Sequence, residues 1–487
     1  MRHRFRAPAL GALGLAVALA TTAAAAPPAA VPAPAPDASH EALERLRLAI
    51  HRVKLKNGLR VVMNVDRSSP TVAIAVTYDV GARNEEPGRS GFAHLFEHMM
   101  FQGSRHVPKG GHFNLISARG GTLNGTTSSD RTNYFEVLPA NELALGLWLE
   151  ADRMRWLAVT PENFENQRAV VQEEYRMRYE NAAYMRGMLR LAELSFDKHW
   201  PYAHSVIGSM ADLENASFEW VRDFHERYYA PNNAVLTIAG DFEQDEAMRL
   251  VNQYFGGGVP TQVPAYDPAP LAPQSAERRD QVEDQNAKTP GLFYGWIIPE
   301  SRTAEHYALE LAAMVLTDGE SSRLHRRLVL ERGVLRSVSA WTSGHRGPDL
   351  FAMMATLTTR SKLPTIEREL DAAVRELAEK GPSAAELERV KNRMRTRFLF
   401  GLEANLSRAT RLGEFEVFWG DARSFTRELD AYLAVTRERV QAAAAKYLTN
   451  ARRNVVTVLP MAQAAAPPGK PPAPSAPAGA ASKGAQP

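Results

Sequence analysis

The sequence predicts an α+β protein of two homologous units, each a mainly antiparallel sheet flanked by helices. The 487 residues suffice for two units of ordinary domain size. Apolar, strand-like runs alternate in both halves with segments of helical length. The two halves also end alike, with FHERYYAPNNAVLTIAGD and AAAAKYLTNARRNVVTVLP, each a helix end, a tyrosine, an asparagine-containing turn and a strand. These endings favour duplication over chance similarity.

We expect the N-terminal unit to span 46–258 and the C-terminal unit 286–460. Five prolines interrupt the stretch between them, and no periodicity is visible there, so 259–285 is predicted to be a linker. Segment 27–45, whose first part is rich in Pro and Ala, is predicted to be a second linker. The Ala/Pro-rich tail 461–487 is expected to be disordered.

The first 26 residues have the order of a secretory signal peptide: arginines, an apolar run, then small residues. An uncleaved membrane anchor is the alternative, but the run is rich in Ala and Gly and only weakly hydrophobic. Its three arginines account for the net charge of +3, so the remaining chain is neutral. That balance argues against a nucleic-acid or membrane-surface protein. Cysteine is absent, which fits an exported, periplasmic protein.

Within the first half we expect strands at 52–56, 59–64, 71–80, 120–134 with turns, 135–138 and 233–240, and helices at 91–102, 140–157, 161–180 and 218–229. Asn57-Gly58 is a strong hairpin signal between the first two strands. Within the second half we expect strands at 291–298 and 350–357 and helices at 304–316, 363–379 and 383–400, followed by the final strand.

The segment GFAHLFEHMMFQGS at 91–104 carries the chemistry. On a helix, His94, Glu97 and His98 share one face, because residues three and four apart are neighbours. Two imidazoles at this spacing can bind one zinc ion, and the carboxylate between them can take a proton from a bound water. The order H-x-x-E-H is that of the inverzincin class.

Ser90 is the predicted N-cap of this helix, and Gly103 is predicted to close it. Because the helix is apolar on nearly every side, we expect it to be buried. Three ionisable groups in a buried helix are costly unless they are compensated, and a metal provides that compensation. The alternative is a buried His-Glu pair with structural hydrogen bonds.

The helix that Thr160 opens before a proline can bring a third ligand. Glu173 and Glu174 adjoin on it. Glu174 follows Val170 by four residues and Val171 by three, so it falls with the apolar stripe, and spacing favours it. The alternative is a solvated glutamate pair. His199, His204 and His225 lack partners at metal spacing and are expected to be structural or exposed, and neither G-x-S-x-G nor a P-loop occurs.

From about residue 50 to 460 the chain resembles the M16 (pitrilysin/insulysin-like) zinc metallopeptidases. The resemblance rests on HLFEHMMFQGS, the GGTLNG stretch at 120–125 and NQRAVVQEEYRMR at 166–178. In its length, export signal and two-domain build the chain resembles the bacterial relatives of the mitochondrial processing peptidase β subunit. This resemblance implies the LuxS/MPP-like metallohydrolase fold.

The resemblance further implies one Zn²⁺ per chain, held by His94, His98 and Glu174, with Glu97 as the general base. R-x-V-V-x-x-E is the family pattern around the third ligand, which supports Glu174 over Glu173. It also implies that Asn124 and Gly125 lie on an edge strand to which substrate adds as an extra strand.

Two departures from the family pattern stand out. Many members have a second glutamate seven residues before the ligand glutamate, where this chain has Gln167. A side chain that supports the ligands from this position is therefore neutral rather than anionic. The Arg and Tyr that bind substrate in the later half align here with Val329 and Arg336, and the pair is missing. In two-chain members the partner supplies it, so we expect a heterodimer with a homologous chain that lacks the zinc motif.

Taken together, the sequence predicts a zinc-dependent endopeptidase that hydrolyses peptides or extended segments. Two alternatives stay open: a catalytically inactive assembly or scaffold subunit of a peptidase-like complex, and a periplasmic zinc-binding protein. Zinc content and peptide cleavage together distinguish the three.

Overall fold

The structure is a computed structural model that describes residues 48–359 and 362–461. The predicted signal peptide, the linker 27–45 and the tail beyond 461 lie outside the described residues. Within the described ranges, no helix combines the length and the apolar composition that a membrane crossing requires.

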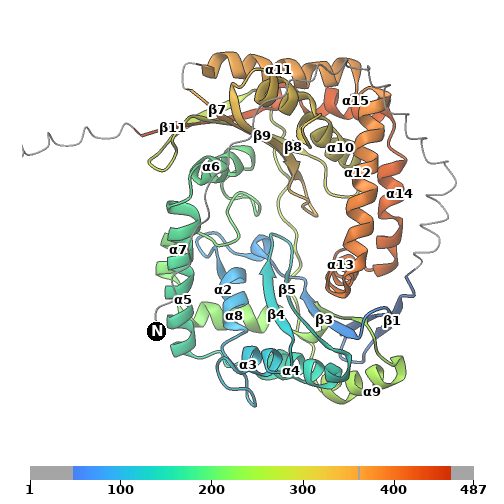
Figure 1. Ribbon diagram of the computed structural model, residues 1–487. Helices are drawn as coiled ribbons and strands as arrows, with labels where there is room; N and C mark the ends of the chain where they lie inside the picture. The colour runs from blue at the N-terminus through green and yellow to red at the C-terminus, as the bar shows by residue number, and fades with distance from the viewer. Residues whose placement is uncertain (1–47, 360–361, 462–487) are drawn as a thin grey trace, which may run out of the picture. The chain divides into compact units, whose positions relative to one another are not determined.

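The first sheet has six strands in the order β1-β2-β6-β3-β5-β4. Figure 1 shows β4 beside β5 in this sheet. The strands are β1 His51–Lys54, β2 Arg60–Val65, β3 Thr71–Tyr78, β4 Thr122–Thr127, β5 Thr132–Pro139 and β6 Ala234–Gly240. Strands β2 and β6 run parallel, and the other neighbours are antiparallel. The hairpin predicted at Asn57-Gly58 is confirmed, with Gly58 in the left-handed region (φ 89°). Strand β4 lies at the edge of the sheet, with β5 as its neighbour.

The second sheet has five strands in the order β7-β11-β8-β10-β9. They are β7 Arg278–Asp284, β8 Gly291–Ile298, β9 Leu335–Thr342, β10 Asp349–Leu357 and β11 Asn454–Pro460. From β2 onward, the first sheet has the same order: a parallel pair first, then three antiparallel neighbours. The prediction of two mainly antiparallel sheets flanked by helices is therefore confirmed.

Fourteen α-helices accompany the two sheets in the described residues, besides short 3₁₀ and π turns. They are α2 Phe92–Met99, α3 Gly111–Ser117, α4 Leu143–Trp156, α5 Pro161–Tyr175, α6 Met185–Ser195, α7 Met210–Asn215, α8 Phe218–Tyr228, α9 Gln244–Phe255, α10 Ala304–Thr317, α11 Leu363–Lys380, α12 Ala384–Glu403, α13 Asn405–Trp419, α14 Glu428–Leu433 and α15 Arg437–Tyr447. The predicted starts at Thr160 and Ser383 are confirmed, since each side-chain oxygen accepts a hydrogen bond from the third backbone N–H of its helix.

One helix from each half of the chain packs against the sheet of the other half. Helix α6 packs against β8 and β11, and α13 packs against β3 and β6. Both helices approach closely because a glycine faces the sheet: a Cβ on Gly187 would lie 2.3 Å from Val458 Cγ2, and one on Gly413 would lie 2.9 Å from Thr77 Oγ1. The core of each sheet is therefore completed by residues distant in the sequence.

The linker prediction is wrong for its last part. Residues 258–275 form neither helix nor strand, but β7 begins at Arg278 and pairs in parallel with β11. Its sequence, RRDQVED, has no apolar alternation because β7 is an edge strand and most of its side chains are exposed or half-exposed. Charged residues are common on edge strands, where they discourage pairing with other chains.

A buried ion pair joins α10 to β10. His306 is 2% exposed, and its Nε2 lies 2.8 Å from Asp349 Oδ2, while Nδ1 lies 3.4 Å from Glu310 Oε2. Burial alone lowers the pKa of His306, but the hydrogen bonds and charges of Asp349 and Glu310 outweigh it and raise that pKa to about 9. The second half therefore contains a histidine that is charged at neutral pH.

This pair predicts a loss of stability in mild alkali. A raised pKa contributes stability that is fully present below the unfolded value near 6.5 and is lost as pH rises through about 9. Between pH 6.5 and about 9 the free energy of unfolding of the wild-type protein should fall by about 3 kcal/mol because of this group, and His306→Gln should remove that fall. Urea unfolding at pH 6.5 and 9.5 measures the effect, with the exposed His199→Gln as control. An unchanged pH dependence in His306→Gln would contradict the assignment.

Candidate metal centre

Helix α2 begins at Phe92, and its N-cap is Gly91 in the left-handed region (φ 94°), not the predicted Ser90. The carboxylate of Glu85 accepts hydrogen bonds from the N–H groups of Gly91 and Ala93, both at 2.8 Å. A side chain brought from the preceding loop thus satisfies free backbone donors at the helix start. The Ser90 prediction is wrong because this tertiary contact replaces a local one.

Ser90 has a different role: its N–H and hydroxyl both bind Asp212 of α7. The C-terminal prediction is also wrong, because α2 ends at Met99 and Gly103 (φ 98°) lies in the turn that follows. The expected burial is confirmed, since most of the helix, including His94, is buried. The histidines therefore lie in an apolar helix anchored by polar contacts at its start.

The side chains of His94, His98 and Glu174 converge. The two histidines lie on α2, whereas Glu174 lies on α5, 76 residues after His98 in the sequence. Glu174 Oε2 lies 3.8 Å from His94 Nε2 and 3.2 Å from His98 Nε2. The ligand-type atoms of the three residues all lie within 4.8 Å of one another, and theirs is the one such cluster of three or more found in the described residues. The structure thus brings together the three predicted ligands.

The donor set and its spacing suit zinc. Two imidazole nitrogens and one carboxylate oxygen are a known catalytic zinc set, and tetrahedral coordination separates ligand atoms by roughly 3.3 Å. The two measured separations lie on either side of that value. Burial, with smaller electrostatic contributions from the neighbouring His98 and Arg178, lowers the pKa of His94 to about 3. Its imidazole is therefore neutral, the form that binds a metal.

The second carboxylate oxygen of Glu174 faces Arg178. Arg178 Nη1 lies 2.9 Å from Glu174 Oε1, and it comes from the π-helical turn Arg176–Glu180 that continues α5. Glu173, the other candidate from the sequence, is exposed and pairs with Arg176 at 3.1 Å. The two adjacent glutamates therefore face different surroundings, and only Glu174 joins the histidines.

Glu97 lies on α2 between the two histidines and is half-buried. Its Oε2 accepts a hydrogen bond from Thr127 Oγ1 at 2.6 Å. Burial raises the pKa of Glu97, and the hydrogen bond from Thr127 opposes that shift. A carboxylate whose affinity for protons is raised in this way suits the role of a base that must hold a proton transiently.

Asn124 and Gly125 lie on the edge strand β4, beside α2. A Cβ on Gly125 would lie 3.1 Å from Glu97 Cγ, so the strand passes directly along the general-base candidate. The N–H of Ser128 donates to the C=O of Arg131, so this pair of residues is hydrogen-bonded across the two strands. Hydrogen-bonded and non-hydrogen-bonded pairs alternate along antiparallel strands. The backbone N–H and C=O groups of Gly125 and Thr127 therefore point away from β5. The Gly125 N–H is bonded to Asn124 Oδ1 at 2.9 Å.

Other residues singled out from the sequence do not join the cluster. Gln167 is buried on α5, and its Nε2 donates to Asn166 Oδ1 at 2.7 Å rather than to a metal-ligand candidate. Val329 packs against the core of the second sheet, and Arg336 is exposed on β9. The histidines outside the motif stay apart from it: His199 is exposed, and His225 stacks on Phe96 and Tyr229.

Three residues that shape the site carry signals too weak to be recognised in the sequence. Arg178 follows Glu174 by four residues, which places it on the same helix face. Thr127 follows Gly125 by two, which places both on the same face of the strand. Glu85 has no local signal, because it reaches the helix start through a loop.

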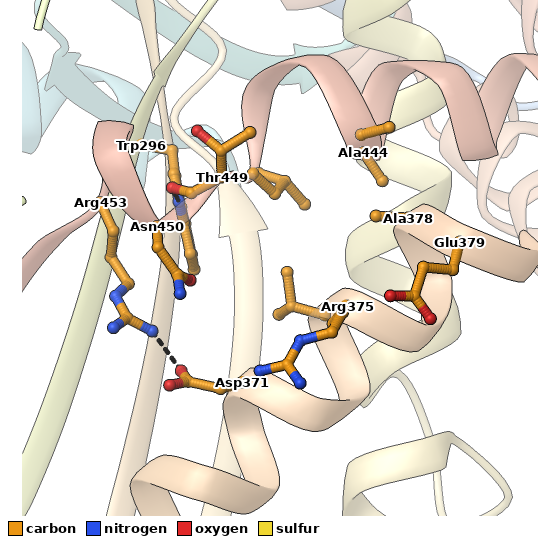
Figure 2. Close-up of a pocket in the computed structure, with 12 residues that line it drawn as sticks. Trp296, Asp371, Arg375, Ala378, Glu379, Ala444, Thr449, Asn450 and Arg453 are labelled. Carbon is orange, nitrogen blue, oxygen red and sulfur yellow. Dashed lines mark hydrogen bonds and ion pairs between the residues drawn. The ribbon is translucent and has the colours of Figure 1, made fainter. Parts of the chain in front are cut away.

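Two pockets lie away from this cluster. One of about 390 Å³ lies between α11 and α15, over Trp296 (Figure 2). Its Asp371 pairs with Arg453, while Arg375 and Glu379 line its α11 side. Another, of about 420 Å³, lies between α4, α8 and α9. Neither pocket is lined by three His, Asp or Glu side chains close enough together to hold a metal ion, whereas His94, His98 and Glu174 form such a group in the described residues, so the cluster on α2 and α5 remains the candidate site.

Comparison with known proteins bears on the family to which the chain belongs. The sequence profile described as "Insulinase (Peptidase family M16)" matches residues 60–195, and that described as "Peptidase M16 inactive domain" matches 215–394. The first match contains the whole cluster, and the second begins after it and extends into the second half. The zinc protease PqqE of Helicobacter pylori is 27% identical over 361 residues, 72% of this chain and 80% of that protein. An uncharacterized zinc protease of Mycobacterium tuberculosis is 28% identical over 413 residues, 82% and 91% of the two chains.

Solved structures share the fold. A protease from Helicobacter pylori superposes with a TM-score of 0.80 at 26% identity and covers 85% of this chain and all of its own. An M16 inactive domain from Pseudomonas fluorescens gives a TM-score of 0.75 at 17% identity, with coverage of 85% and 98%, which supports the fold alone. With both family profiles matched in order, the chain belongs to the M16 family of peptidases.

Proposed function

We propose that this protein is a zinc-dependent endopeptidase that hydrolyses peptides or extended segments of polypeptide. The observation that carries the proposal is the convergence of His94, His98 and Glu174 with Glu97 on the same helix turn. The names of the relatives, zinc proteases, support the same activity.

His94, His98 and Glu174 would hold the ion, which when bound supplies Lewis-acid activation of a water molecule and of the scissile carbonyl. Glu97 accepts the proton of the attacking water and later returns it to the leaving amine. Arg178 holds the second oxygen of Glu174, which leaves Oε2 directed to the histidines.

The backbone groups of β4 that point away from β5 support an extended substrate. Gly125 and Thr127 present N–H and C=O groups on the open side of the sheet, beside Glu97. A peptide that pairs there as a seventh strand has its main chain fixed next to the metal-ligand cluster. Asn124 Oδ1 has to release the Gly125 N–H when substrate pairs.

Metal removal tests this proposal. The purified protein is expected to contain about one zinc per chain and to cleave a quenched-fluorescence peptide library. Dialysis against 1,10-phenanthroline abolishes cleavage, and stoichiometric zinc restores it. Zinc binding without cleavage of any peptide would instead support the inactive scaffold subunit, and absence of zinc would contradict the metal site.

We also propose that the active species is a heterodimer with a homologous chain that lacks the zinc motif. Val329 and Arg336 occupy the positions at which the family pattern has a substrate-binding pair, so this chain lacks that contribution. Purification of the chain alone, as an active homodimer, would contradict this proposal.

We propose that the protein is periplasmic and is exported through the signal peptide at 1–26. The apolar run behind three arginines and the absence of cysteine support it. N-terminal sequencing of the mature protein from a periplasmic fraction tests whether the segment is removed.

A further inference from the structure

The base candidate Glu97 is held by one polar contact. Among the described residues, its carboxylate has a single hydrogen-bond partner, the hydroxyl of Thr127 at 2.6 Å. An O–H donor to an ionised carboxylate at this distance is one of the stronger hydrogen bonds in proteins. The orientation of the Glu97 carboxylate therefore depends on one side chain from another element.

The stem of Glu97 lies against Gly125, close to aromatic rings, and His98, Glu174 and Arg131 act on its carboxylate electrostatically. At Gly125 a Cβ would meet Glu97 Cγ at 3.1 Å, the Tyr134 ring at 3.2 Å and the Phe101 ring at 3.3 Å. These groups limit where the stem of Glu97 can lie, but they cannot fix the rotation of its carboxylate, because the terminal torsion of glutamate is broad. The hydrogen bond from Thr127 supplies that constraint.

Thr127 is also part of the open edge of the sheet. It is the last residue of β4, pairs with Thr132 of β5, and directs its own backbone groups away from β5. The neighbouring Thr126 is held by a different side chain. Arg131 Nη1 donates to the Thr126 hydroxyl at 2.6 Å and to its carbonyl oxygen at 3.0 Å. The end of β4 is thus held in place on both faces.

We propose that Thr127 is a positioning residue for peptide hydrolysis, whose hydroxyl orients the Glu97 carboxylate while its backbone lies on the strand edge that receives the substrate. This inference rests on the proposed peptidase function and extends it. One residue then aligns the base with a substrate that is paired to the same strand. A base must lie within hydrogen-bond reach of the proton it takes, and a displacement of about 1 Å can reduce the rate by about 10²-fold.

The matched pair Thr127→Val and Thr127→Ser tests the proposal. Valine keeps the shape and the strand propensity of threonine but removes the hydroxyl, whereas serine keeps the hydroxyl. We expect Thr127→Val to lower kcat by about 10–100-fold with KM within about twofold of wild type, since the backbone that pairs with substrate is unchanged. Thr127→Ser should recover most of the lost kcat, and both variants should keep stoichiometric zinc.

A second background separates positioning from a structural effect. In Glu97→Gln, adding Thr127→Val should lower the residual kcat by less than about twofold, because the two changes disable the same step. Wild-type kcat in Thr127→Val, a loss confined to KM, no recovery with serine, or a full additional loss in the Glu97→Gln background would each overturn the proposal. If wild type itself cleaves no peptide, the proposed function fails first, which is a distinguishable result.

Discussion

Glu97→Gln is expected to lower kcat for peptide cleavage by about 10²–10⁴-fold, the usual contribution of a general base. The amide has nearly the size of the carboxylate and can still accept the hydrogen bond from Thr127, but it cannot take a proton. The three ligand candidates are untouched, so the zinc content should stay near one per chain. Steady-state kinetics on a quenched peptide and elemental analysis of the same preparation measure both quantities.

The matched control for this variant is Glu173→Gln. Glu173 is exposed and lies next to a ligand candidate in sequence, but it pairs only with Arg176. The same chemical change there should leave both zinc content and kcat close to wild type. Near-normal turnover by Glu97→Gln would refute its role as the base, whatever the zinc content.

The second large effect is expected on zinc affinity. Glu174→Ala removes the one ligand candidate contributed by α5 and leaves two histidines on a single helix turn. Loss of an outer partner of a metal ligand already costs about 10–100-fold in affinity, so loss of the ligand itself should exceed about 100-fold. Zinc competition with a chromogenic chelator measures the dissociation constant.

Glu173→Ala is the adjacent control, because it removes the same number of atoms from the same helix. It should bind zinc as wild type does. Equal zinc affinities in Glu174→Ala and Glu173→Ala would show that α5 contributes no ligand. Circular dichroism and thermal unfolding of both variants verify that neither result reflects a loss of the fold.

Local spacing explains what could be predicted from the sequence. The relation of His94, Glu97 and His98 depends on one helical turn, and the start of α5 at Thr160 depends on a cap and the proline after it. Glu174 could be preferred to Glu173 because it follows the buried Val171 by three residues, whereas Val170, the other member of the predicted stripe, is exposed. Its approach to the histidines is a tertiary contact that the resemblance implied.

Long-range contacts explain what was missed. Ser90 had the residue type of a cap, but Glu85 occupies the start of α2 from outside the helix. Helix α13 was not predicted: its face is set by the sheet of the other half, which it approaches through Gly413. Thr127 gave no signal because pairing with β5, not its own neighbours, brings its hydroxyl to Glu97.

The central claim is that two helices, α2 and α5, assemble one zinc site beside Glu97. The most direct test is anomalous diffraction at the zinc absorption edge from crystals of the whole chain. The account predicts one strong peak within bonding distance of His94, His98 and Glu174. A zinc ion bound elsewhere, or Glu174 turned away from the two imidazoles with zinc present, would contradict it.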